Sequence, residues 1–136
     1  MENIIKITKV FGGAIAAVCT ALWGKPDAWL YALLGCVALD YITGITAAYI
    51  TETLSSEVGF RGLLKKMLLL LIVALANMLD NLMGMGGVLR SLVIGFYIAN
   101  EGLSLLENAG RCGVQLPDKL LSALKQLQSD GDKAAK

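Results

Sequence analysis

Histidine is absent from this sequence, and ionisable side chains are few. Only 17% of the 136 residues are charged, and the formal net charge is +1. The absence of histidine removes the commonest acid–base catalyst and the commonest metal ligand. A net charge near zero provides no basic field that would attract nucleic acid. We therefore expect no enzyme activity, no cofactor or metal, and no nucleic-acid partner.

Cysteine is also scarce. Cys19, Cys36 and Cys112 lie far apart in the sequence, so no two of them have the spacing of a metal-binding or redox pair. We interpret them as small hydrophobic residues. The glycines at 12–13 and the glycine-rich stretch 84–87 are too short and too isolated to indicate a nucleotide-binding loop.

Apolar residues are abundant, at 56% of the total. The longest apolar run follows Lys65 and Lys66 and continues through 67–76 without a polar side chain. Such a run is too long for a buried strand and indicates a helix that is hydrophobic on all sides. With the other apolar stretches, it predicts an all-α integral membrane protein with four transmembrane helices, at about 4–23, 28–50, 63–83 and 88–108.

The first stretch leaves an alternative open. It reaches the ~20 residues of a span only if Lys6 and Lys9 extend their side chains to the membrane surface. If it lies flat on the membrane instead, the chain has three spans. With four spans, all lysines and arginines except Lys25 and Arg90 fall on one side. Because short loops rich in these residues stay in the cytoplasm, both termini are expected there.

The sequence changes character after Gly113, where the transmembrane domain (1–113) ends. Leu116-Pro117-Asp118 has the pattern of a helix start with proline in the first turn. Leucines then recur on one face, which predicts a cytoplasmic amphipathic helix over 114–128 that lies on the membrane or packs on a partner. Residues 129–136 are expected to form a disordered charged tail.

A carboxylate lies near the middle of the second span, at Asp40, where it costs ~2.5–3.5 kcal/mol on insertion scales. Asp40 shares a helix face with Thr43 and Gly44, and Gly44 and Ala48 form a strip of small residues. Two interpretations are open. The face is either a helix-packing seam with a protonated or hydrogen-bonded Asp40, or a surface that lines water once subunits assemble.

The third and fourth spans form a predicted hairpin with its turn at 84–87. The third span becomes polar on one side near this turn, at Asn77 and Asp80. Counting outward from the turn brings Asp80 level with Arg90, and Lys65 level with Glu107. We expect an ion pair, or at least a water-bridged contact, between Asp80 and Arg90, and a second pairing between Lys65 and Glu107; these pairings would fix the register of the hairpin.

The fourth span carries two further strips. One is polar and suits a surface that water can wet; the other is small and allows close helix approach. These strips suit either an assembly with a hydrated interior or a fixed bundle with a polar core. The polar strip is Asn100, Glu101, Ser104, Glu107 and Asn108, and the small strip is Gly95, Ala99 and Gly102.

Several short sequence blocks follow one another in an order that is characteristic of one protein family. They are Asp40-Tyr41-Ile42-Thr43-Gly44, then 55–62 (SSEVGFRG) with Lys65-Lys66, then 100–108 (NEGLSLLEN), then Gly113 and Leu116-Pro117. With the spacing of the apolar stretches, these blocks make residues 33–127 resemble the toxin-secretion/phage-lysis holin family.

The resemblance implies a protein encoded by a phage or prophage. Such proteins accumulate in the bacterial cytoplasmic membrane of the host and then assemble into homo-oligomeric lesions. Through the lesion an endolysin reaches the cell wall, or a toxin leaves the cell. The blocks point to Asp40, Gly44, Asn100, Glu101, Ser104, Glu107 and Asn108. Two other classes stay open from the residues alone: a small ion channel or transporter, and a membrane anchor or immunity-type protein.

Overall fold

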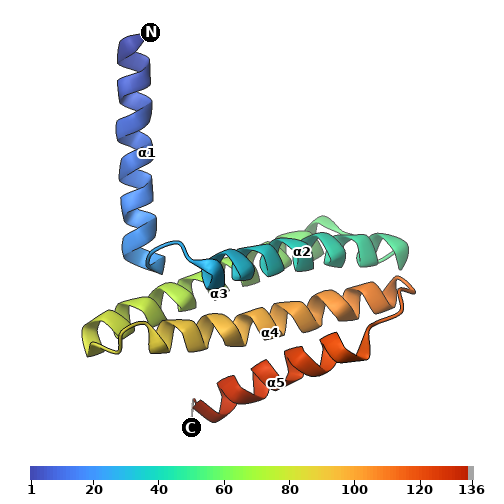
Figure 1. Cartoon of the computed structure of the whole chain (residues 1–136). Helices are drawn as coiled ribbons and strands as arrows, with labels where there is room; N and C mark the ends of the chain where they lie inside the picture. Colours follow the sequence, from blue (N-terminus) through green and yellow to red (C-terminus); the bar gives the residue numbers. More distant parts are fainter. Residues whose placement is uncertain (135–136) are drawn as a thin grey trace.

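The computed structural model describes residues 1–134, and the part it describes consists of helices and short turns. The helices are α1 (Glu2–Trp23), α2 (Ala28–Ile50), α3 (Ser56–Met83), α4 (Val88–Arg111) and α5 (Asp118–Ala134) (Figure 1). Within the described residues, α1 to α4 are long and apolar enough to cross a membrane. This finding confirms the predicted all-α membrane class.

Helix α4 is the centre of the bundle. It packs against α2, α3 and α5, and Figure 1 shows it between α2 and α5. Leu33 of α2, Val73 of α3 and Ile94 of α4 are fully buried where the three helices meet. Most other large apolar side chains of α2 and α3 are exposed on the outside of the bundle, as in a protein whose surroundings are lipid.

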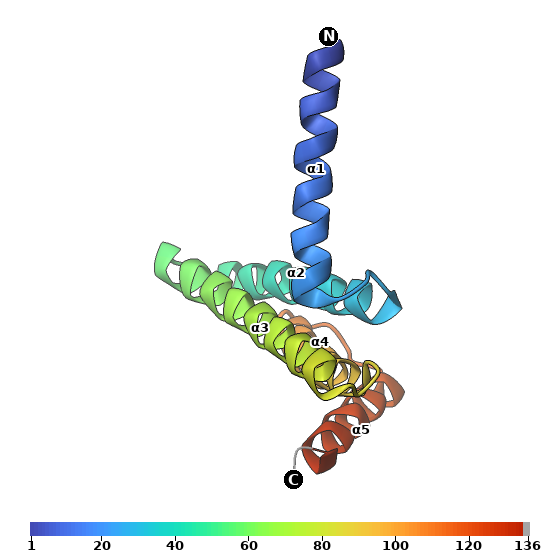
Figure 2. The same cartoon turned by 90° about the vertical axis from the view of Figure 1, so that its left-hand side faces the viewer.

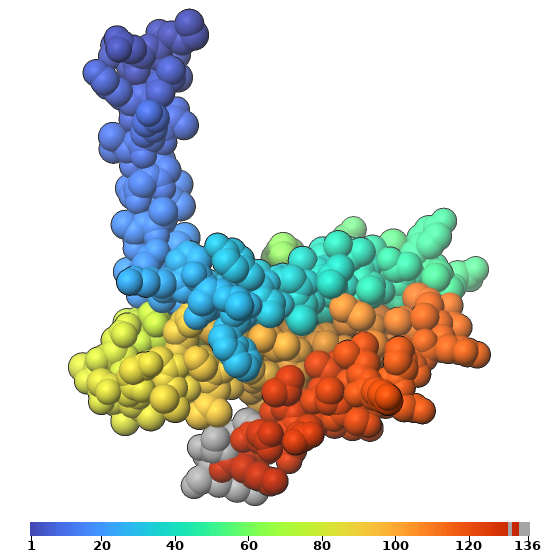
Figure 3. Space-filling view, in the orientation of Figure 1, coloured from blue at the N-terminus to red at the C-terminus, as the bar shows by residue number. Residues whose placement is uncertain are grey.

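Helix α1 stands away from this bundle. It runs crosswise to the other helices in both views, and nothing covers its sides in the space-filling view (Figures 1, 2 and 3). No residue of α1 is buried, and Phe11 is 70% exposed. A helix that crosses the direction of α2, α3 and α4 cannot lie along the membrane normal when those three do. The arrangement therefore keeps the three-span alternative open.

Helices α3 and α5 extend well beyond the predicted segments. Helix α3 begins at Ser56 and not at 63, because the side chain of Ser55 accepts a hydrogen bond from the Val58 N–H (3.2 Å) and caps the helix. The predicted disordered tail 129–136 is wrong over 129–134, because α5 continues through Ala134. The composition of 129–134 does not favour a helix, and the packing of α5 along α4 stabilises it there. Residues 135–136 lie outside the described part.

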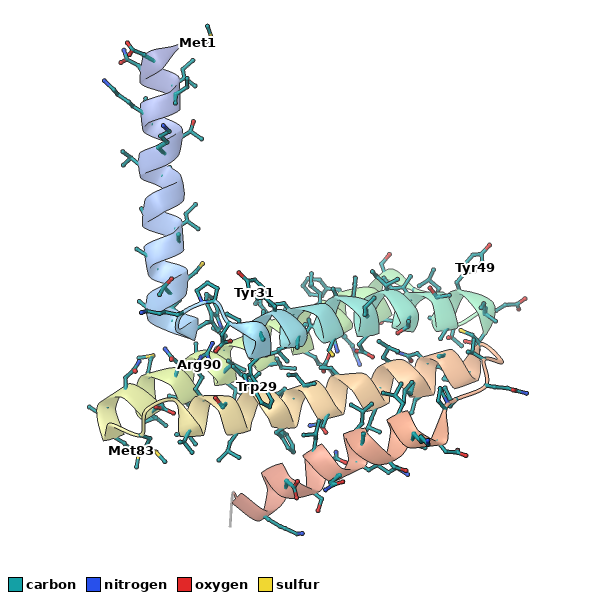
Figure 4. The ribbon with its side chains drawn as sticks, viewed as in Figure 1. Met1, Trp29, Tyr31, Tyr49, Met83 and Arg90 are labelled. Carbon is teal, nitrogen blue, oxygen red and sulfur yellow. The ribbon has the colours of Figure 1, made fainter. Side chains whose placement is uncertain are left out.

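The aromatic residues at the ends of α2 face outward, as expected at a membrane boundary. Tyr31 is 65% exposed near the start of the helix, and Tyr49 is 74% exposed near its end (Figure 4). Trp29 is half-exposed and packs against Gly95 of α4.

Candidate functional site

A cluster of charged side chains joins the three bundle helices. Asp40 comes from α2, Lys66 from α3 and Glu101 from α4, and the Lys66 ammonium forms ion pairs with both carboxylates. Their side chains are 8%, 15% and 11% exposed, respectively. We call these three residues the charge cluster. One cation between two ionised carboxylates gives the cluster a formal charge of −1.

Asn108 extends the charge cluster along α4. Its amide donates hydrogen bonds to Asp40 Oδ1 (3.1 Å) and to Thr43 Oγ1 (3.4 Å). Gly44 lies beside this amide, and a Cβ built there would be in ordinary contact with the Asn108 nitrogen at 3.5 Å. Every buried side-chain polar atom within the described residues has a hydrogen-bond partner. Each subunit therefore compensates its own mid-span carboxylates, as the first interpretation of Asp40 required.

The predicted ion pair between Lys65 and Glu107 is wrong. Both residues are exposed and form no ion pair in the structure, and Lys66 takes the inward position. Successive residues on a helix lie about 100° apart, so only one of two adjacent lysines can face α2 and α4. Counting levels along a hairpin gives depth, but not which way each residue faces.

The predicted ion pair between Asp80 and Arg90 is also wrong. The Asp80 carboxylate, 2% exposed as a residue, accepts hydrogen bonds from the backbone N–H of Gly87 (2.6 Å) and of Arg90 (2.9 Å). It therefore caps the N-terminus of α4, where a negative charge is favourable. Asp80 thus ties the two helices of the hairpin through the backbone and not through a side-chain cation.

The Arg90 guanidinium turns instead toward the connection between α1 and α2 (Figure 4). It pairs with Asp27 Oδ2 (2.6 Å) and donates to the carbonyl oxygens of Trp23 (2.7 Å) and Lys25 (3.3 Å). The hydrogen bond from Arg90 holds the pKa of Asp27 below its usual value. Asp27 also caps α2 by accepting from the Leu30 N–H (2.9 Å).

Asn77 closes the end of α1. Its amide donates to the carbonyl oxygens of Ala21 (3.3 Å) and Leu22 (3.1 Å), which have no partner inside their own helix. The Trp23 indole N–H donates to the Leu70 carbonyl oxygen (2.8 Å). These bonds attach α1 to α3 at one end only. Sequence reasoning marked Asn77 as a polar intramembrane residue but could not identify this partner, which lies more than fifty positions away.

The small residues predicted to mediate helix packing contact neighbours within one subunit. A Cβ built at Gly95 would lie 3.3 Å from Trp29 Cζ3, and one built at Gly102 would lie 2.9 Å from Leu124 Cδ2 of α5. Ala99 is fully buried, and Ala48 is 5% exposed. Next to Gly102, the Asn100 side-chain oxygen accepts a hydrogen bond from the Gln128 amide of α5 (2.6 Å).

Comparison with known proteins identifies the type of chain that carries this site. A family model described as the bacteriophage holin family matches residues 17–129. The chain belongs to the bacteriophage holin family. It is 40% identical over 94 residues to a probable holin of Bacillus phage phi105, an alignment that covers 69% of this chain and 70% of that protein.

Other relatives of this holin-family chain match over nearly its whole length. It is 42% identical over 130 residues to an uncharacterised 14.9 kDa protein in the nagH 3′ region of Clostridium perfringens, covering 95% of this chain and 98% of that protein. It is 38% identical over 120 residues to an uncharacterised protein of Listeria innocua, covering 88% and 84%. No solved structure matches the chain.

Helix α5 gives this holin-family chain one charged outer face. The helix packs along α4 of its own chain, and its outer side carries exposed ionisable residues. Each charge at the centre of a bilayer costs ~2.5–3.5 kcal/mol on insertion scales. The α4–α5 side of the bundle therefore requires water wherever α5 keeps this position. The exposed ionisable residues are Asp118, Lys119, Lys125, Asp130, Asp132 and Lys133.

Proposed function

We propose that this chain acts as a holin of the bacterial cytoplasmic membrane, where it oligomerises and opens lesions through which an endolysin or a toxin crosses. The observation that carries the proposal is the match to the bacteriophage holin family, together with the likeness to the probable holin of phage phi105. Both termini are proposed to lie in the cytoplasm, on the side that carries most of the lysines and arginines, as long as α5 stays outside the membrane; with α5 packed along a membrane-spanning α4, its C-terminal end lies toward the 84–87 turn on the opposite side.

The single subunit suits the phase in which such a protein accumulates in the membrane without opening it. The Lys66 ammonium forms ion pairs with Asp40 and with Glu101, and all three side chains are mostly buried. The outer surfaces of α2 and α3 are apolar, so lipid can surround them. A subunit of this kind can accumulate in the membrane without conducting ions.

Assembly would supply the water that α5 needs. A ring of subunits that turn their α4–α5 sides inward would place the charged outer face of α5 against a hydrated interior. The apolar faces of α2 and α3 would remain against lipid. In this arrangement the Asn100–Gln128 bond stays inside each subunit. Within the polar strip of α4, Asn100 then supports the helix that lines the lesion, whereas Glu101 and Asn108 bind side chains of α3 and α2.

Inducible expression in a bacterium with and without a cytoplasmic endolysin tests the proposal. With the endolysin, turbidity should collapse at a defined time after induction; without it, growth should stop while the culture stays turbid. A large membrane-impermeant dye should enter the cells at the same time. Passage of ions without the dye would indicate a channel and would refute the proposal, and no change in permeability would indicate an anchor.

Labelling of single cysteines decides whether the chain has three or four spans. The native cysteines are replaced, and one cysteine is introduced at Glu2 or at Lys25. An impermeant reagent should reach Lys25→Cys from outside in both arrangements. Labelling of Glu2→Cys from outside would place α1 flat on the outer surface, whereas labelling only after cell disruption would establish α1 as a span.

A further inference from the structure

Helices α2 and α3 flank a groove near the turn at 51–55, and α4 contributes to its lining. This groove has a volume of about 310 Å³, and we call it the α2–α3 groove. Its walls include the apolar residues Ile45, Leu54 and Val58. Across the groove, the Tyr41 hydroxyl contacts the Gly59 carbonyl oxygen at 3.5 Å and links the two helices.

Cations outnumber carboxylates in the groove. Lys65, Lys66 and Arg111 line it, together with one carboxylate, Asp40. Lys66 is already committed to the charge cluster. Neither Lys65 nor Arg111 forms an ion pair with any residue in 1–134, and Arg111 makes only a 3.5 Å hydrogen bond to a threonine hydroxyl. Two uncommitted positive charges therefore face an apolar groove.

We propose that the α2–α3 groove binds one anionic phospholipid, with the head group at Lys65 and Arg111 and an acyl chain packed on the apolar wall that includes Ile45. Charge complementarity selects an anion, and basic pockets between membrane helices are known to suit lipid head groups. The apolar wall selects a lipid over free phosphate, because only the lipid has chains to bury there. The bound lipid joins α2 to α3 beside the contact between Tyr41 and Gly59.

The proposal rests on membrane insertion and not on lysis, so the two can fail separately. Native mass spectrometry of the purified full chain in detergent counts the lipids that it retains. Phosphatidylglycerol and phosphatidylcholine are added at equal concentration. We expect one phosphatidylglycerol to be retained about tenfold more strongly than phosphatidylcholine. Glycerol 3-phosphate, which carries the head-group charge without chains, should not displace it.

Two variants separate the groove from general attraction. Lys65→Gln with Arg111→Gln should reduce retention of phosphatidylglycerol about 10- to 30-fold, since each cation near an anionic head group contributes about tenfold or less. Val58→Trp should reduce retention by filling the groove while leaving the charge unchanged. The matched control, Lys119→Gln with Lys125→Gln on α5, removes the same charge and should leave retention unchanged.

Equal retention of phosphatidylglycerol and phosphatidylcholine by the unmodified chain would overturn the proposal, whatever the variants do. A control pair that loses as much retention as the groove pair would overturn it as well, because it would show diffuse attraction. Displacement by glycerol 3-phosphate would identify a site for a free anion in place of a lipid.

Discussion

Lys66 pairs with two buried carboxyl groups at the centre of the bundle. Its ammonium is the only cation paired with Asp40 and with Glu101 among the residues that the structure describes. Replacing Lys66 with methionine keeps a long side chain of similar volume and removes the charge. Two buried carboxyl groups then remain beside each other with no cation between them.

The two carboxylates would respond differently to the loss of Lys66. Asp40 keeps the hydrogen bond from Asn108 at 3.1 Å, whereas Glu101 has no other hydrogen bond from its side chain in the described residues. Removing one partner of a buried ion pair typically destabilises a protein by 3–5 kcal/mol. We expect Lys66→Met to lower the free energy of unfolding by ~4 kcal/mol, roughly a thousandfold in the equilibrium constant.

Unfolding of the purified chain in detergent, followed by circular dichroism, measures this loss. Lys65→Met is the matched control, because it removes the same charge one position earlier at an exposed site; we expect a change within ~0.5 kcal/mol. The triple variant Lys66→Met, Asp40→Asn and Glu101→Gln should recover most of the loss, since it leaves no buried charge unpaired. Equal stability of Lys66→Met and Lys65→Met would refute the structural role of the charge cluster.

Three further predictions concern the ends of the helices. Arg90 holds the pKa of Asp27 below its usual 3.8, so this stabilisation is complete above that value and is lost as pH falls through the lower pKa of the folded state. The stability difference between the parent chain and Asp27→Asn, followed by pH titration in detergent, should therefore shrink below about pH 4; a constant difference would contradict the ion pair. Asp80→Ala removes the cap of α4 and should lower the free energy of unfolding by about 1–2 kcal/mol in denaturant titration, where a change near zero would exclude the cap. Asn77→Leu frees the end of α1, so the backbone amides at 20–24 should exchange hydrogen faster than in the parent chain, and unchanged exchange would show that the Asn77 bonds do not hold α1.

The sequence was sufficient for the helices and for their apolar character. Runs such as 67–76 are hydrophobic on every side, so their preference for lipid does not depend on what they pack against. The turn at 84–87 and the helix start at 116–118 carry local signals in glycine and proline, and the structure places helix ends at both. The blocks at 40–44 and 100–108 also indicated the holin family before any comparison.

The partners of the polar residues depended on the tertiary structure. Sequence spacing placed Asp80 level with Arg90, yet the helix rotates the Arg90 side chain toward Asp27 and leaves its backbone N–H to Asp80. Sequence spacing also does not tell whether Lys65 or Lys66 faces the interior of the bundle. The rotation of α3 about its own axis decides this, and the packing of Val73 against Leu33 and Ile94 sets that rotation.

Sequence alone therefore determined which segments prefer lipid and where the chain turns, because hydrophobic period and turn chemistry act over a few residues. Only the tertiary structure decided which charge meets which, that α5 folds back on α4, and that α1 runs across the bundle. Those outcomes depend on how helices rotate and pack against segments distant in sequence, and a one-dimensional pattern does not contain that information.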